Sequence, residues 1–343
     1  MVKTPMKTLH SSSWDRTRLL ALVSKMKKKK ILVLGDVGID RYTVGSVERI
    51  SPEAPVPVVL VNQEILKLGL AANVADNIRA LGGTPYLLGV LGKDRRAADF
   101  CELLLSQGIS DEWMLRDSTR CTALKERVVS ESQQLLRIDY ESLHGISKEI
   151  ERKLLEKVSL LLKQVDGVIV EDYAKGLLTP GLAQGVFEKA RAQGKWVALD
   201  PNVKTPVALY RGADVLTPNQ KEAEHLAGMK ITDPASLLRA GQEILNQTQA
   251  RAVVITRGKD GMAIFDSTSS QVQLIPTFAK EVYDVSGAGD TVISVLMLAL
   301  VSGASLGEAC ILGNLAAGVE VGKRGTATVS PGEIREALKV GHA

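Results

Sequence analysis

The sequence predicts an α/β protein with a mostly parallel central sheet, helices on both of its faces, and a small antiparallel β lid. Short β-branched runs alternate with helical stretches along most of the chain, as expected for strands joined by crossover helices. Two other segments alternate apolar and polar residues, which is typical of half-exposed antiparallel strands. We see no internal repeat and no low-complexity linker, so a single domain that carries a lid is preferred over two independent domains.

The expected strands of the central sheet are apolar, and several of them end in Gly, Asp or Asn. They are residues 30–36, 85–94, 166–172, 195–201, 213–219 and 250–258. Ligands bind at the carboxyl ends of parallel strands, so the polar residues that follow these runs are candidates for a binding site. The alternating segments 55–64 and 124–139 are expected to belong to the lid, which extends over about 41–64 and 112–140.

The main domain is expected over residues 30–335, between an N-terminal basic arm and helix (1–29) and a C-terminal tail (336–343). The first 30 residues hold nine of the 43 Lys and Arg but one of the 39 Asp and Glu, which leaves 34 basic and 38 acidic residues in the remainder. A slightly acidic body has no general attraction to nucleic acid, so no nucleic-acid partner is expected. The lysine run 27–30 is either a solvated face or an arm that binds polyanions.

Composition points to a cytoplasmic protein with a large core. The chain has 343 residues, 45% of them hydrophobic, and its three cysteines form no CxxC pair, which argues against a disulfide framework. The longest apolar run, 292–301, is about half of what a membrane span needs, so no membrane association is expected. The four histidines are isolated and have no metal-ligand spacing.

The motif "DVSGAGDT" (284–291) stands directly before the most apolar helical stretch of the chain. Gly287, Ala288 and Gly289 at a helix start would let backbone amides approach a bound anion, and the helix dipole would favour its charge. Asp290, in the first turn, could accept a proton from an attacking hydroxyl group. The alternative is an ordinary N-cap with an acidic first turn.

Further polar segments follow other expected strands. They are "GDVGID" (35–40), "LGLAANVADNIRALGG" (68–83), "LTPNQKEAE" (216–224) and "ITRGKDG" (255–261). Each segment alone could be a turn or a cap. Together they are expected to converge on one crevice at the edge of the sheet.

These motifs resemble those of the ribokinase-like family of carbohydrate kinases, over about residues 30–335. "DVSGAGDT" is similar to that family's C-terminal signature, "TPNQKE" to its NxxE motif, and "GVEVGKRGT" (318–326) to its adenine-pocket segment. The resemblance implies a ribokinase-like fold, ATP and Mg²⁺ as cofactors, and Asp290 as the catalytic base, with the amides of residues 287–289 stabilising the transferred phosphoryl group.

The resemblance also implies binding residues for each substrate. For the sugar they are Asp36, Asp40, Gly69, Asn73, Lys125, Arg127 and Asp172; for ATP they are Lys204, Asn219, Glu222, Thr256, Gly258, Gly261, Asn314 and Gly318. Glu222 would hold Mg²⁺ through water. Lys175 and Arg137 would add positive charge near the sugar.

Within the family, four segments are most similar to the kinases of D-glycero-β-D-manno-heptose 7-phosphate: "GDVGIDRYTVGSVERISPEAPVPVV", "SQQLLRIDYE", "EDYAKG" and "EVYDVSGAGDTV". The implied reaction is phosphorylation of the anomeric hydroxyl group to the 1,7-bisphosphate, as in lipopolysaccharide core precursor synthesis. A homodimer through the β lid is expected. No HxGH motif of a nucleotidylyltransferase occurs, so no nucleotide sugar is expected as a product.

Three positions depart from the family pattern. Leu70 replaces the second of two paired glycines, Glu131 stands where heptose kinases tend to carry a basic residue, and Asn202 stands where a lysine is common. The alternatives are therefore a kinase of another sugar or sugar phosphate, or a catalytically weak sugar-binding or nucleotide-binding protein. An NAD-dependent oxidoreductase is disfavoured because "GDVGID", and not GxGxxG, follows the first strand.

Overall fold

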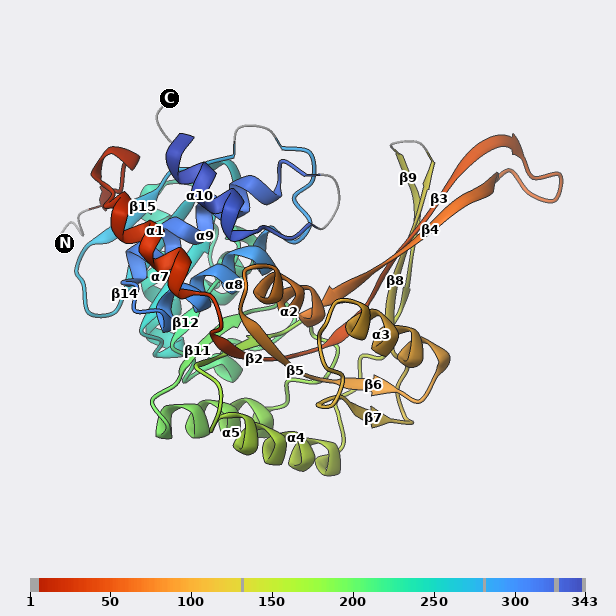
Figure 1. The fold of residues 1–343 in the computed structure, drawn as a ribbon, viewed down its shortest axis with the longest axis horizontal. Helices are drawn as coiled ribbons and strands as arrows, with labels where there is room; N and C mark the ends of the chain where they lie inside the picture. Colours follow the sequence, from red (N-terminus) through yellow and green to blue (C-terminus); the bar gives the residue numbers. More distant parts are fainter. Residues whose placement is uncertain (1–5, 131–132, 280–281, 324–326, 341–343) are drawn as a thin grey trace.

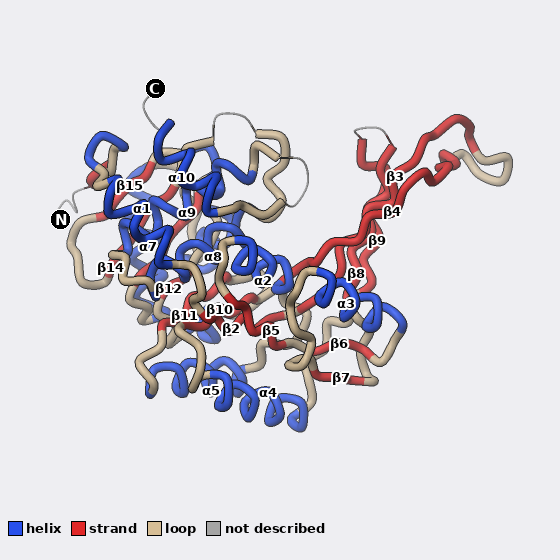
Figure 2. Tube along the Cα trace, viewed as in Figure 1, coloured by secondary structure: helices blue, strands red, loops and turns tan. Residues whose placement is uncertain are grey.

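A nine-stranded sheet forms the centre of the computed structural model, which describes residues 6–130, 133–279, 282–323 and 327–340. Neighbouring strands run parallel, except that β14 is antiparallel to both of its neighbours (Figure 1, Figure 2). Across the sheet the strands are β1 (Met6–Thr8), β15 (Val272–Ile275), β14 (Met262–Asp266), β13 (Ala252–Thr256), β12 (Val215–Leu216), β11 (Trp196–Asp200), β10 (Gly167–Glu171), β2 (Lys30–Gly35) and β5 (Thr84–Leu88). The prediction of a mostly parallel sheet is confirmed.

Helices cover both faces of this sheet, because successive strand residues face two separate apolar clusters. Ile31 and Val33 belong to one cluster, and Leu32 and Leu34 to the other. The first cluster also contains residues of α1 (Arg16–Lys25), α2 (Ala71–Ala80), α3 (Arg95–Ser106), α8 (Ala288–Val301), α9 (Leu306–Glu320) and α10 (Pro331–Val340). The second contains residues of α4 (Lys148–Leu161), α5 (Pro180–Ala192), α6 (Gln220–Ala227) and α7 (Pro234–Thr248). Strands buried on both sides explain the continuous apolar runs in the sequence.

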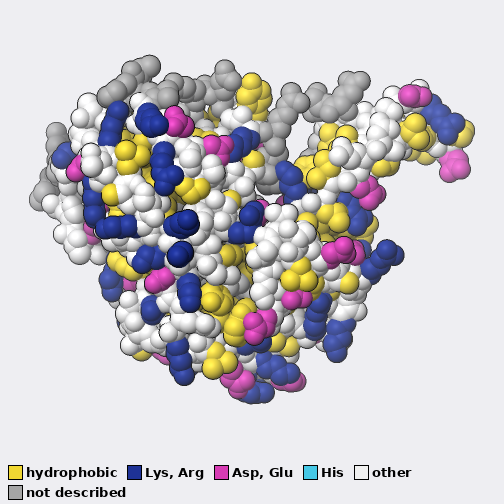
Figure 3. All heavy atoms as spheres, in the orientation of Figure 1, with side chains coloured by type: hydrophobic (Ala, Val, Ile, Leu, Met, Phe, Trp, Pro, Cys, Tyr) yellow, Lys and Arg dark blue, Asp and Glu magenta, His cyan; other side chains and the backbone are white. Residues whose placement is uncertain are grey.

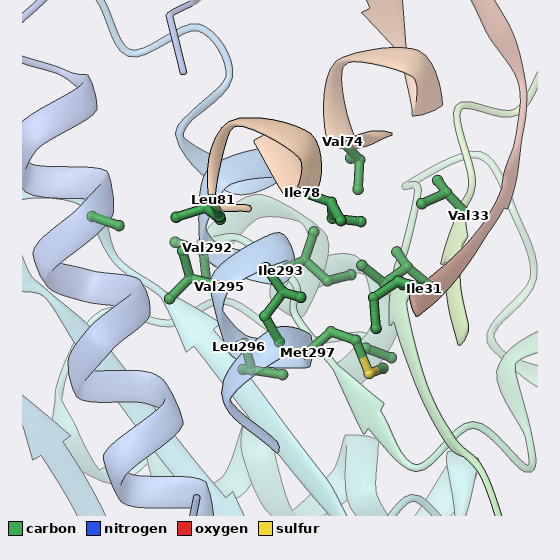
Figure 4. Packing of buried hydrophobic residues seen from close by; sticks show 14 of the residues in the cluster. Ile31, Val33, Val74, Ile78, Leu81, Val292, Ile293, Val295, Leu296 and Met297 are labelled. Atoms are coloured by element: carbon green, nitrogen blue, oxygen red, sulfur yellow. The ribbon is translucent and has the colours of Figure 1, made fainter. Parts of the chain in front are cut away.

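Helix α8 is buried over most of its length. Every residue from Thr291 to Leu300 is buried. Figure 4 shows the side chains of this helix packed against those of α2 and β2, with Ile293 close to Ile78 and Met297 close to Ile31. Burial of each large apolar side chain stabilises the fold by about 1.5–3 kcal/mol. The position of the helix start, and of Asp290 on it, is therefore fixed by the core.

The lid is a four-stranded sheet that projects from the body (Figure 1). Its strands, in order across the sheet, are β4 (Pro57–Leu70), β3 (Val37–Ile50), β8 (Ala123–Ser130) and β9 (Gln133–Tyr140). The pair β3 and β8 is parallel, whereas the other pairs are antiparallel, so the expected purely antiparallel lid is corrected. Residues 112–122 lie outside this sheet: β7 (Leu115–Asp117) pairs with β6 (Val90–Gly92) in a separate sheet.

Both ends of the described chain pack onto the main body. Strand β1 pairs with β15 at the edge of the main sheet, and α1 buries Leu19, Leu22 and Val23 in the core. Residues 336–340, which we expected in a tail, belong to α10. Three short 3₁₀ helices complete the elements: Ser11–Ser13, Val207–Tyr210 and Gly258–Asp260. None of the described helices is long and apolar enough to span a membrane.

Candidate active site

Helix α8 begins at the motif for which the sequence predicted an anion site. Gly287 is the N-cap, with φ 97° and ψ −7°, a left-handed conformation that glycine adopts without steric cost. The Thr291 amide donates to the Gly287 carbonyl at 2.9 Å, so the helix begins directly at the motif. The Ala288 amide has only a long bond of 3.4 Å to the Val285 carbonyl. These amides therefore lie at the positive end of the helix dipole, as the sequence predicted.

Asp290 is held by donors on both of its carboxylate oxygens. The Asn73 Nδ2 group donates to Oδ2 at 2.6 Å, and the Tyr173 hydroxyl group donates to Oδ1 at 2.9 Å. Burial raises the pKa of Asp290 to about 6, and the two hydrogen bonds oppose that rise. Asn73, which was expected to line the sugar pocket, contacts the proposed base in this structure. Tyr173 was missed, although it belongs to the quoted segment "EDYAKG".

Two further carboxylates face Asp290. One oxygen from each of Glu171, Asp200 and Asp290 lies within 4.8 Å of the others. Glu171 is 1% exposed, and neither of its carboxylate oxygens has a hydrogen-bond partner among the described residues. Burial, and then the negative charge of the neighbouring carboxylates, raises the pKa of Glu171 well above its usual value. The sequence analysis missed Glu171 and Asp200, since each is the last residue of an ordinary apolar strand.

Asn219 and Glu222 form a capping box at the start of α6. The Glu222 amide donates to Asn219 Oδ1 at 3.1 Å, and the Asn219 amide donates to Glu222 Oε2 at 2.8 Å. One oxygen of Glu222 is therefore engaged by its own helix. Burial, and then the negative charge of Glu222, raises the pKa of Asp200. Glu222 is not one of the three carboxylates whose oxygens lie within 4.8 Å of one another.

A cavity of about 340 Å³ lies next to the start of α8. Five of the expected ATP-binding residues line it, namely Thr256, Gly258, Gly261, Asn314 and Gly318. Ala288 and Gly289, the two residues before Asp290, also line it. Lys204 is exposed and does not line this cavity. The cavity therefore joins the predicted nucleotide segments to the predicted anion site.

Asp36 and Asp172, both expected to bind sugar, use their carboxylates to hold the loop after β10. Asp36 accepts from the Lys175 amide at 3.0 Å and from the Leu177 amide at 3.3 Å. Asp172 accepts from the Ala174 amide at 2.8 Å and from the Tyr210 hydroxyl group at 2.7 Å. Burial raises the pKa of Asp36 to about 6. In this structure both side chains fix the backbone around Tyr173.

The lid brings together the remaining expected sugar-binding residues. Asp40 pairs with Arg127, with 2.7 Å from Oδ1 to Nη1, and a Cβ atom at Gly69 would lie 2.9 Å from Asp40 Oδ2. The Lys125 ammonium group lies 5.3 Å from the centre of the Tyr173 ring. Burial lowers the pKa of Lys125, and the charge of Asp40 opposes that effect.

Two more cations carry acidic partners of their own. Lys175, in the loop after β10, forms an ion pair with Glu141, and Arg137, on β9, pairs with Asp139 at 2.7 Å. Lys125, by contrast, has no ion pair in the part of the chain that the structure describes. The surplus of positive charge expected from the sequence is therefore smaller than the number of cations suggests.

The structure describes two of the three positions that depart from the family pattern. Leu70 is the N-cap of α2, with φ 58° and ψ −140°, and its side chain is 5% exposed. A side chain in this region of backbone conformation costs on the order of 1–3 kcal/mol. Asn202 Oδ1 accepts from the Lys204 amide at 3.0 Å. Glu131 lies outside the described residues.

The mostly parallel sheet with a projecting lid is shared with solved structures of the ribokinase-like fold. The structure matches Arabidopsis thaliana ribokinase complexed with ribose and ATP, with a TM-score of 0.71, 19% identity, and coverage of 91% of this chain and 99% of that one. It matches phosphofructokinase-2 from Escherichia coli in complex with potassium, with a TM-score of 0.76, 22% identity, and coverage of 92% and 100%. The predicted ribokinase-like fold is confirmed.

The chain belongs to the pfkB family of carbohydrate kinases, whose model matches residues 28–332. It is 42% identical over 329 residues to the bifunctional protein HldE of Geotalea uraniireducens, covering 96% of this chain and 66% of that protein. It is 44% identical over 308 residues to the bifunctional protein HldE of Helicobacter hepaticus, covering 90% and 63%. The chain thus spans slightly less than two thirds of the length of these relatives.

Proposed function

We propose that this protein transfers the terminal phosphoryl group of ATP to the anomeric hydroxyl group of D-glycero-β-D-manno-heptose 7-phosphate. The observation that carries the proposal is the position of Asp290: its carboxylate lies at the start of α8, between the 340 Å³ cavity and the lid, with a donor on each oxygen. The similarity to HldE proteins supports a heptose phosphate as the acceptor.

In the proposed step, the sugar hydroxyl oxygen attacks the terminal phosphorus atom of ATP. The bond from that phosphorus to the bridging oxygen breaks, ADP leaves, and the hydroxyl proton passes to Asp290. Proton transfer to a positioned base contributes about 10²–10⁴ in rate. The amides of Gly287, Ala288 and Gly289 would donate to the transferred group, where negative charge is spread over its oxygens.

The carboxylate cluster fits a divalent cation. Glu171 and Asp200 would hold Mg²⁺, because hard carboxylate oxygens are its preferred ligands and Glu171 has two buried oxygens without a hydrogen-bond partner among the described residues. Bound Mg²⁺ would neutralise phosphate charge during transfer. Glu222, which we expected as the principal metal residue, would act from beside the cluster through water.

Lys125 and Arg127 are our candidates for binding the far phosphate of the acceptor. Lys125 is a half-buried cation without an ion pair among the described residues, and Arg127 is a planar donor that suits phosphate. Binding at the far end of the sugar would direct its anomeric hydroxyl group toward Asp290. A kinase of another sugar phosphate stays the alternative, since Leu70 and Asn202 depart from the family pattern.

We also propose that two copies associate through the lid. Its exposed apolar side chains are Val47, Ile50, Val56, Leu60, Val61, Leu66, Leu136 and Tyr140. Exposed apolar side chains gathered on one small sheet indicate an interaction surface. A second copy of the same lid would remove these apolar side chains from water, and burial of apolar surface is the main favourable contribution to association.

The test is ADP release with ATP, Mg²⁺ and a panel of acceptors, on the wild type and Asp290→Asn. We expect the heptose 7-phosphate to react best, and Asp290→Asn to bind ATP while losing at least about 100-fold in turnover. Turnover of Asp290→Asn within about ten-fold of wild type would exclude the base assignment. Equal reaction of ribose, fructose or an unphosphorylated heptose would exclude the phosphorylated acceptor.

A further inference from the structure

Tyr173 lies between the lid and the proposed base. Its hydroxyl group donates to Asp290 Oδ1 at 2.9 Å, and its ring lies under the Lys125 ammonium group, 5.3 Å from ring centre to Nζ. Asn73 occupies the other carboxylate oxygen at 2.6 Å. Two donors on two oxygens fix the plane of the carboxylate, and each oxygen keeps a second lone pair for a substrate proton.

The backbone around Tyr173 is held in one conformation. Ala174 has φ 53°, which costs a non-glycine residue on the order of 1–3 kcal/mol. Its amide donates to Asp172, and the next turn of the loop donates two amides to Asp36. These buried hydrogen bonds offset the strain, so the tyrosine side chain enters the site from a rigid loop.

We propose that Tyr173 is a positioning residue, which orients the Asp290 carboxylate toward the acceptor hydroxyl group. This inference rests on the proposed function, in which Asp290 is the base. Tyr173 itself transfers no proton. Its contribution is the orientation of one oxygen, and a misplaced catalytic group lowers the rate of the chemical step without weakening substrate binding.

Tyr173→Phe removes the hydroxyl group and keeps the ring under Lys125. Because the variant loses a hydrogen bond to the charged Asp290 carboxylate, we expect kcat to fall by about 10- to 100-fold. We expect the KM for ATP and for the sugar phosphate to stay within about two-fold of wild type. The matched control is Tyr86→Phe, a tyrosine on β5 whose ring packs against Trp113 outside the site. We expect Tyr86→Phe to keep wild-type kcat.

A double-mutant cycle with Asp290→Asn separates positioning from a structural role. If Tyr173 acts through Asp290, Tyr173→Phe causes no further loss in the Asp290→Asn background, measured as single turnovers with enzyme in excess. An additive loss in that background, or an increase in sugar KM that exceeds the fall in kcat, would overturn the inference. Thermal melts of each variant set the assay temperature, so that every variant is measured folded.

The two failures are distinguishable. If Asp290→Asn retains turnover, the proposed function fails at the base itself. If Asp290→Asn is inactive while Tyr173→Phe has wild-type kcat, the proposed function stands and the positioning role of Tyr173 is wrong.

Discussion

Arg127 and Asp40 form an ion pair between neighbouring strands of the lid, with 2.7 Å from Nη1 to Oδ1. Both side chains are largely buried, at 17% and 10% exposed. We expected Asp40 to bind sugar hydroxyl groups and Arg127 to bind the phosphate, and in this structure the two side chains contact one another. An acceptor phosphate that binds Arg127 would therefore either displace the Asp40 carboxylate from Arg127 or bind to Arg127 beside it.

We predict that Lys125→Ala and Arg127→Ala each raise the KM for the sugar phosphate by about 10- to 100-fold and change the KM for ATP by less. Initial-rate kinetics with each substrate varied in turn measures both values. Arg152→Ala, which removes an exposed ion pair on α4, is the control and should leave both constants unchanged. Unchanged sugar KM in both lid variants would rule out a phosphate site on the lid.

A side chain at Gly318 should block the nucleotide cavity selectively. A Cβ atom there would lie 3.0 Å from the backbone of Phe278 and Ala279, and Gly318 lines the cavity. Gly318→Val is expected to raise the KM for ATP at least about ten-fold, with the sugar KM nearly unchanged. Gly332→Ala, in α10, has only Ser330 Oγ at 3.7 Å and serves as the control. Normal ATP affinity in Gly318→Val would contradict the assignment of this cavity.

Glu171→Gln should stabilise the metal-free protein and weaken its response to Mg²⁺. The substitution replaces a buried carboxyl group, which stands beside two other carboxylates, with a neutral amide of the same shape. We expect the free energy of unfolding without Mg²⁺ to rise by on the order of 1 kcal/mol. Urea unfolding with EDTA or with Mg²⁺ measures both effects. A variant that gains as much stability from Mg²⁺ as the wild type would exclude Glu171 as a ligand.

The metal-free protein should lose stability as the pH rises through about 6. Burial raises the pKa of Asp36 and of Asp290 to about 6, whereas an unfolded aspartate titrates near 3.9. Between these two pH values the folded state binds more protons than the unfolded state. The contribution of Asp36 and Asp290 to stability is therefore complete below about pH 4 and is lost as the two groups ionise in the folded protein. Thermal melts in EDTA at about pH 5 and pH 7.5 test the sign. A rise in melting temperature over this interval would contradict it.

A charged residue introduced on the lid surface should dissociate the proposed dimer. Leu60 and Leu136 are 62% and 54% exposed, so neither is needed for the core of one copy. We expect Leu60→Asp and Leu136→Asp to sediment as monomers with unchanged melting of the body, because an unpaired charge is not tolerated in an apolar interface. Leu160→Asp, on an exposed position of α4, is the control. A wild type that sediments only as a monomer at micromolar concentration would rule out the lid dimer.

The parts of the site that the sequence predicted are those with a local signal. "DVSGAGDT" combines glycines, an acidic first turn and an apolar helix within 18 residues, and the structure forms a helix start there. Tyr173 could not be predicted, because its role depends on Asp290, 117 residues away. The hydrogen bonds of Asp36 could not be predicted either. The two amides that donate to it lie 139 and 141 residues away, and backbone groups carry no sequence signal.

Strand β3 shows why the lid was only partly predicted. The pairing with β4 shifts register between Val44 and Gly45 and again between Val47 and Arg49. Each irregularity breaks the two-residue alternation by which a half-exposed strand is recognised. Segments 55–64 and 124–139 were recognised by their alternation, whereas residues 41–50 of β3 were included in the expected bounds of the lid without a strand pattern of their own.

The pairing of β1 with β15 also bears on the order in which the chain folds. Met6 lies opposite Val272, so the residues that complete one edge of the main sheet are separated by most of the chain. Closing so long a loop is entropically costly and gives slow, non-local pairing. At about 5–20 residues per second, the ribosome needs on the order of tens of seconds to make the intervening segment. Residues 6–8 therefore stay unpaired until the β14–β15 hairpin has emerged from the ribosome.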